Sequence, residues 1–290
     1  MSIYISTSCL KDGENIFTVL DSYNEFRIEN IELGATHQYA NQKRLIQYIN
    51  SFHHNLTVHN YFPPPKNELI INLASQNKNT LKKSLNFIKR SIRFCTKINV
   101  KLYSLHGGFI LDPDSNFKFK NNLKADSYST SYQNAFDTFL KSVKEVNEYA
   151  EKRRIKIAIE NNTLSESTIT SYKSPLVLMC RTEEFNQLFK YVQSDNLGIL
   201  LDLGHLKTTS YWIGIDKNKF IRGIEGKVFE IHVSENNGKR DEHKKLTEDS
   251  WCLKRLHRFK NTPITLESTN LCMDDILYNK RLLQMAINSD

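Results

Sequence analysis

The sequence predicts an α/β protein that folds as a single (β/α)8 TIM barrel over residues 1–290. Short runs rich in Ile, Val and Leu, typical of buried parallel strands, alternate with amphipathic stretches along the chain. Eight such runs in 290 residues give one cycle per about 36 residues, which is the rhythm of a (β/α)8 barrel. No Gly-rich phosphate loop follows the first strand, where a doubly wound open sheet often carries one.

The eight expected strands are short and apolar, and four of the stretches between them have clear helical periodicity. In chain order, the strands are expected at 3–7, 28–33, 56–59, 101–105, 155–160, 197–202, 227–232 and 263–267. The clearest helices are expected at 82–96, 131–153, 182–192 and 274–287. In the second of these helices, apolar residues from Phe136 to Val146 recur every three or four positions, as on one face of an amphipathic helix.

Composition narrows the class of protein. The 40 Lys and Arg exceed the 32 Asp and Glu, which gives a net charge of +8. This positive net charge permits a polyanionic partner. The basic residues are spread along the chain rather than gathered in one block, however, as in a chain that is generally rich in Lys and Asn. The chain has no apolar run of membrane-spanning length and no secretory signal at its start, so we expect a cytoplasmic protein without membrane contact. Five Cys without a CxxC motif argue against a disulfide framework.

Metal-competent side chains stand at or just after the ends of six consecutive expected strands, from the third to the eighth. They are His59, His106, Glu160, Asp202, His205, His232, Asp241, His243 and Glu267. The C-terminal strand ends of such a barrel meet at one mouth, so we expect these side chains to converge there. Imidazole and carboxylate suit Zn²⁺, Mn²⁺ or Co²⁺, and carboxylates buried together without cations repel one another. The sequence therefore predicts a site for one to three divalent metal ions at the C-terminal mouth.

Two segments carry a family resemblance, namely HNYFPPPKNELIINLAS (59–75) and IHVSENNGKRDEH (231–243). With the strand ends, they make the chain resemble the xylose isomerase-like TIM-barrel superfamily. That superfamily includes sugar-phosphate isomerases and epimerases, and the endonuclease IV class of abasic-site nucleases. The four-residue metal core of the epimerases is similar to Glu160, Asp202, His232 and Glu267. The trinuclear zinc set of endonuclease IV is similar to all nine strand-end residues given above.

The resemblance to the isomerases and epimerases implies proton transfer at a carbon beside a carbonyl of a sugar or sugar phosphate, through an enediolate. Glu160 and Glu267 would then be both metal ligands and the acid/base pair, because they come from strands on different sides of the ring. We expect Tyr61 to cover the apolar face of the sugar, and Lys207 and Arg240 to bind a phosphate. This small-molecule function is the one that the sequence favours.

The alternative is an endonuclease IV-like zinc phosphodiesterase (an AP endonuclease) that acts on abasic DNA or a small phosphoester. Asp202 is followed by Leu-Gly-His where the nuclease pattern has Thr-Cys-His, and Glu242 replaces a basic residue. Glu235, Glu248 and Asp249 add further negative charge at the expected mouth, which disfavours a DNA backbone. A non-catalytic barrel is a third possibility, against which the complete ligand set argues. The sequence predicts no oligomeric state.

Overall fold

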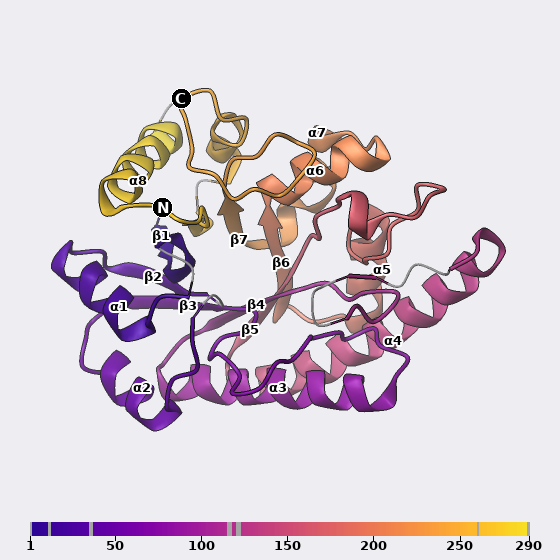
Figure 1. Cartoon of the computed structure of the whole chain (residues 1–290), viewed down its shortest axis with the longest axis horizontal. Coiled ribbons are helices and arrows are strands. Elements are labelled where there is room, and N and C mark those ends of the chain that lie inside the picture. The colour runs from indigo at the N-terminus through magenta and orange to yellow at the C-terminus, as the bar shows by residue number, and fades with distance from the viewer. Residues whose placement is uncertain are drawn as a thin grey trace.

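Eight parallel strands form a closed barrel in which each strand pairs with its neighbours along the chain and β8 pairs with β1 (Figure 1). The computed structural model describes residues 2–10, 13–34, 37–114, 118–119, 123–259 and 261–288. The strands are β1 (Ile3–Ser6), β2 (Asn30–Leu33), β3 (Asn55–His59), β4 (Leu102–His106), β5 (Lys156–Glu160), β6 (Leu197–Asp202), β7 (Val228–Val233) and β8 (Ile264–Leu266). The predicted (β/α)8 barrel is confirmed.

Helices follow the strands and cover the outside of the barrel. The α-helices are α1 (Ile16–Glu25), α2 (Gln42–Ile49), α3 (Lys78–Lys97), α4 (Ala125–Glu151), α5 (Thr182–Val192), α6 (Leu203–Ile213), α7 (Lys217–Ile224) and α8 (Met273–Asn288). Short 3-10 helices are η1 (Thr7–Cys9), η2 (Glu166–Thr168), η3 (Glu225–Lys227) and η4 (Leu253–Phe259). The long helices α3 and α4 pack side by side, and α8 lies close to the N-terminal strand (Figure 1). Among the described residues, no helix has the length and hydropathy of a membrane span.

The expected elements correspond to observed ones, with differences at their ends. The strand expected at 197–202 and the helix expected at 182–192 match β6 and α5, and the other strand ends shift by one or two residues. Helix α4 begins at Ala125 rather than at 131, because its first two turns are polar and carry no apolar repeat. Helices were expected between the strands, and α1, α2, α6 and α7 lie in stretches for which the sequence analysis gave no bounds.

The barrel interior is unusually polar. Side chains alternate along a strand, so residues two before an inward-facing ligand also point into the barrel. On β3, β7 and β8 these residues are Thr57, Glu230 and Thr265, each at most 4% exposed. Branched apolar side chains normally fill this space in such barrels. Here apolar residues such as Ile231 face the helices, and the inside combines these polar groups with apolar side chains such as Leu200.

Candidate metal centre

The nine predicted ligands lie at the C-terminal ends of β3 to β8, in the first turn of α6 and in the loop after β7, and the structure brings their donor atoms together. Within each of three groups, one atom per residue lies within 4.8 Å of the others. The groups are His59–His106–Glu160, Glu160–Asp202–His232–Glu267 and His205–Asp241–His243. Glu160 belongs to two of the groups, so its carboxylate is placed to link them.

Most of the imidazoles are held by one ring nitrogen while the other faces the carboxylates of the centre. The fixing contacts are His59 Nδ1 to Ser104 Oγ at 3.1 Å, His205 Nδ1 to the Asn161 carbonyl at 2.9 Å, His243 Nδ1 to the Glu267 carbonyl at 2.9 Å, and His232 Nε2 to Glu32 at 2.6 Å. A backbone carbonyl only accepts, so His205 and His243 each donate from Nδ1 and keep Nε2 for the centre. Metal-binding histidines are oriented in this way in proteins.

Glu32 is a candidate residue of the metal centre that the sequence analysis did not name. It lies on β2, is fully buried, and accepts a hydrogen bond from His232 Nε2 at 2.6 Å. With His59 and His232 it forms a fourth group of closely spaced donors. Glu32 falls outside the pattern used for the other ligands, because it stands one residue before the end of the expected strand 28–33, whereas they stand at or just after strand ends.

Two local features explain how His106 and His243 reach the centre. His106 ends β4 and is followed by Gly107 and Gly108. A Cβ at Gly108 would come within 2.6 Å of the Ala74 Cβ, and one at Gly107 within 2.8 Å of Asn162 Nδ2, so only glycine lets these loops pack around the mouth. His243 has a φ of 44°, in the left-handed region that residues other than glycine rarely use. Such backbone strain is concentrated at functional sites.

The buried carboxylates have oxygens without hydrogen-bond partners. Glu160 and Asp202 are fully buried, and the side chains of Asp241 and Glu267 are 14% exposed. Among the described residues, Asp202 Oδ2 and Asp241 Oδ1 accept no hydrogen bond, and the Glu160 carboxylate has only imidazoles close to it, with His106 Nδ1 2.8 Å from its Oε2. A buried oxygen without a partner is destabilising, and a cation would relieve this. The imidazole nitrogens and carboxylate oxygens present here fit a divalent ion such as Zn²⁺, Mn²⁺ or Co²⁺.

The electrostatics of the carboxylates depend on the imidazoles around them. Burial by itself would raise the pKa of Glu160, but nearby imidazoles, led by that of His106, outweigh it and lower the pKa to about 2. For Asp202, burial raises the pKa to about 6, because the charge of Glu160 adds to burial and His205 compensates only in part. Two neighbouring carboxylates are therefore pushed in opposite directions, which is typical of a functional site.

The imidazoles show the complementary effect. Burial disfavours their charged form, yet the carboxylates around them raise the pKa values of His205 and His232 well above the ordinary range. For His243, burial is outweighed by Asp241, and the pKa rises to about 10. Without metal, protons on these rings balance the carboxylates at neutral pH. Divalent ions supply the same positive charge, and metal and protons therefore compete for this centre.

The acidic rim expected from the sequence is partly neutralised. Glu242 forms an ion pair with Lys244 at 2.7 Å and accepts a hydrogen bond from the Asn237 backbone. Glu235 forms an ion pair with Lys207. The sequence analysis expected this acidic rim to repel a phosphate. The two ion pairs weaken that repulsion.

The three expected substrate-binding residues lie outside the metal-ligand groups. The Tyr61 hydroxyl accepts a hydrogen bond from the Ile71 amide at 2.8 Å, and its ring lines a cavity of 690 Å³ that also contains Lys66 and Lys83. Lys207 is occupied by Glu235 and by the Asn236 carbonyl. Arg240 is exposed in the loop after β7, where its backbone amide donates to Asn237. Their roles towards a substrate stay predictions.

Comparison with known proteins identifies the family. The model of the xylose isomerase-like TIM barrel family matches residues 15–280, so the chain belongs to this family. An uncharacterized protein of Methanocaldococcus jannaschii is 27% identical over 248 residues, which cover 84% of this chain and 81% of the relative. The protein named "Probable endonuclease 4" of Persephonella marina is 24% identical over 234 residues, which cover 74% of this chain and 73% of the relative.

Solved structures support the same fold. A D-tagatose 3-epimerase-like protein superposes with a TM-score of 0.76 at 22% identity, covering 99% of this chain and 97% of that protein. The structure titled "IOLI protein with a binding zinc atom" superposes with a TM-score of 0.68 at 13% identity, covering 99% and 98%. At these identities the likeness shows the fold, which both sugar-processing and nuclease branches of the family share.

Proposed function

We propose that this protein is a phosphoester hydrolase that uses two or three divalent metal ions. The observation that carries the proposal is the division of nine donors into three groups, two of which share Glu160. An isomerase of the expected kind needs only the four-residue group around Asp202. The other two groups would then bind no metal ion. Each of them nevertheless contains an imidazole whose Nδ1 is held by a hydrogen bond.

The chain supplies largely buried ligands for such chemistry, several of them held by hydrogen bonds. When bound, divalent ions here would polarise a phosphoryl group and lower the pKa of water. Glu160 would serve as a ligand in both groups that contain it, while Asp202 Oδ2 and Asp241 Oδ1, which accept no hydrogen bond from the described residues, would be free to bind a cation. Outside the centre, Lys66 and Lys83 line the cavity beside Tyr61 and provide positive charge for a second phosphate or a charged substituent.

The neutralised rim supports this reading over the sugar isomerisation that the sequence alone favoured. That preference relied on Glu242 and its acidic neighbours, two of which pair with lysines. The similarity to a protein named as an endonuclease 4 over three quarters of the chain supports the same class of chemistry. The proposal covers two kinds of phosphoester, abasic DNA and a small molecule, which separate assays distinguish.

The test combines metal content with activity. Protein purified without chelators is analysed for bound elements, and then assayed on bis(p-nitrophenyl) phosphate and on a duplex with one abasic site. We expect two or three zinc or manganese ions per chain and hydrolysis of at least one substrate. A single ion per chain, with no hydrolysis of either substrate after metal addition, would overturn the proposal.

A second candidate function is the metal-dependent sugar (phosphate) isomerase or epimerase. It is favoured by one observation, namely that Glu160 and Glu267 come from β5 and β8 and belong to the same four-donor group. This arrangement suits one carboxylate that removes a proton and another that returns it. The readout is exchange of solvent deuterium into ketoses and ketose phosphates, followed by NMR. Exchange that depends on Glu267, together with one ion per chain, would favour this function over hydrolysis.

A further inference from the structure

Asn161 forms hydrogen bonds to two candidate metal ligands and belongs to none of the donor groups itself. It directly follows Glu160 at the end of β5 and is 2% exposed. Its side-chain Oδ1 accepts a hydrogen bond from the Asp202 amide at 2.8 Å, and its Nδ2 donates to the Asp202 carbonyl at 3.0 Å. Its own carbonyl accepts from His205 Nδ1 at 2.9 Å. One residue therefore holds the backbone of one ligand and the ring of another.

The side-chain contacts of Asn161 begin where the pairing of β5 with β6 ends. The register of these two strands runs up to the pair of Glu160 and Leu200. Asp202 lies two residues further along β6, so this ladder does not reach it. A carboxamide offers one donor and one acceptor, as a peptide group does. The side chain of Asn161 thus takes the place of a further strand residue and joins Asp202 to β5.

The backbone of Asp202 decides where two ligands lie. Asp202 is the N-cap of α6, and its Oδ1 accepts a hydrogen bond from the His205 amide at 2.7 Å. Its other oxygen, Oδ2, accepts no hydrogen bond from the described residues. His205 follows in the first turn of the same helix. A shift of this short segment against β5 would therefore move Asp202 and His205 together relative to Glu160.

We propose that Asn161 is a positioning residue that sets the distance from Glu160 to the two ligands Asp202 and His205. Glu160 belongs to two donor groups, Asp202 to one of these, and His205 to the group that also contains Asp241. Asn161 therefore holds the three groups in one arrangement from outside them. The inference rests on the metal centre proposed above, and it applies to hydrolysis and to isomerisation alike.

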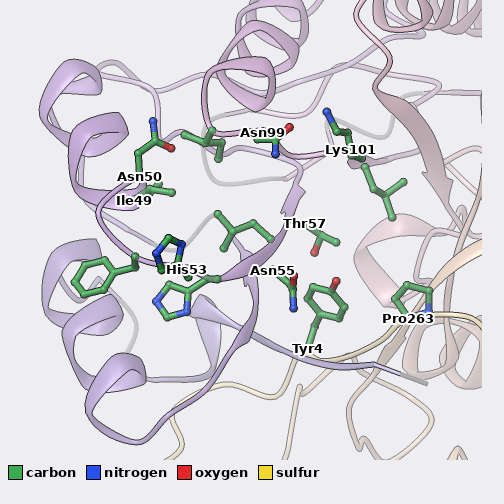
Figure 2. A pocket seen from close by; sticks show the side chains of 14 residues that line it. Tyr4, Ile49, Asn50, His53, Asn55, Thr57, Asn99, Lys101 and Pro263 are labelled. Carbon is green, nitrogen blue, oxygen red and sulfur yellow. The ribbon is translucent and has the colours of Figure 1, made fainter.

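The chain offers two matched control residues at the opposite end of the barrel. Asn196 stands just before β6, and its Nδ2 donates to the carbonyl of Ile155, the residue before β5, at 2.9 Å. Asn55 begins β3, and its Nδ2 donates to Asn30 Oδ1 on β2 at 2.8 Å. Figure 2 shows Asn55 in the lining of a pocket at this N-terminal end. Substitution of either residue removes a hydrogen bond between neighbouring strands at a strand's length from the donor groups.

The test measures zinc affinity by competition with a chromophoric chelator, in the unchanged protein and in Asn161→Ala, Asn196→Ala and Asn55→Ala. We expect Asn161→Ala to lower the affinity by about 10–100-fold, as loss of a group that orients metal ligands typically does. Both control variants should keep the affinity of the unchanged protein. In a second measurement Co²⁺ replaces zinc, because its visible spectrum reports ligand geometry, and the spectrum should change only in Asn161→Ala. Tm of each metal-free variant separates loss of stability from loss of positioning.

Two results would overturn the inference and leave the metal centre in place. In one, Asn161→Ala binds zinc as tightly as the unchanged protein. In the other, Asn196→Ala loses as much affinity as Asn161→Ala, and the loss then reflects the stability of the strand pair. An unchanged protein that binds no zinc would overturn the metal centre itself and this inference with it. If Asn161→Ala does not fold, Asn161→Ser replaces it with the same expectation, because a hydroxyl cannot make both contacts of the amide.

Discussion

The mouth and the interior of this barrel are built from the same strands but carry different chemistry. Residues only two positions apart on β7, His232 and Glu230, contribute to the two regions. At the mouth, carboxylates are interleaved with five imidazoles, each within contact of an acid. Below it, Glu230 is surrounded by hydroxyls and another carboxylate. The comparison teaches that the type of side chain, rather than burial, distinguishes the imidazole-rich mouth from the interior, because both regions are largely buried.

The largest expected effect comes from removing the residue that links two groups at the mouth. Glu160→Gln keeps the shape of the side chain but removes its charge, so both groups that contain Glu160 lose affinity for metal. We expect loss of at least one ion per chain and a fall in hydrolysis of about a thousandfold or more. Elemental analysis measures the number of ions per chain, and initial rates measure hydrolysis. Glu184→Gln is the control for loss of a buried acid, and retention of full metal content by Glu160→Gln would contradict the grouping.

A smaller effect is expected from residues that hold the imidazoles. Glu32→Gln weakens the contact that orients His232, and we expect affinity for the ion bound by the four-residue group to fall by about 10–100-fold. Competition with a chelator measures that affinity. Ser104→Ala, which removes the weaker contact to His59, should lower the affinity of its own group by less. Equal effects of the two substitutions would show that the charge of Glu32 does not matter.

The metal-free protein should lose stability as the pH rises from 7 to 10. The folded-state pKa of His243 is raised to about 10, above its ordinary value of 6.5, so its contribution is complete below pH 6.5 and is lost as the pH approaches 10. His205 and His232 act in the same direction. In the metal-bound protein the imidazoles are already neutral, so we expect a flat profile there. Tm measured across this range with and without chelator gives the comparison, and parallel profiles would contradict it.

The smallest expected effect concerns the rim. Glu242→Gln removes a charge that is partly exposed and paired with Lys244, so we expect KM for an anionic phosphoester to fall by about twofold, with kcat unchanged. Steady-state kinetics at low and high salt measure this, and the effect should vanish at high salt. A tenfold or larger fall in KM would show that Glu242 repels an anionic substrate strongly, as the sequence analysis expected.

Local pattern was sufficient to find most of the site. Once a barrel is predicted, strand ends such as His106, Glu160 and Asp202 must meet, because parallel strands in a closed barrel share one C-terminal edge. Glu32 shows where this reasoning failed. Its place in the centre depends on His232, which lies on β7 and is not adjacent to β2 in the barrel.

The sequence by itself determined the α/β class, the eight-strand rhythm and the mouth at which the candidate ligands converge, since hydrophobic period and strand order are properties of the chain. Only the tertiary structure decided how the donors divide into groups and that Glu160 belongs to two of them. It also decided that Lys207 and Lys244 neutralise part of the rim, and that the barrel interior is polar. The physical reason is that pairing, burial and pKa depend on distances between residues far apart in the chain, which periodicity does not encode.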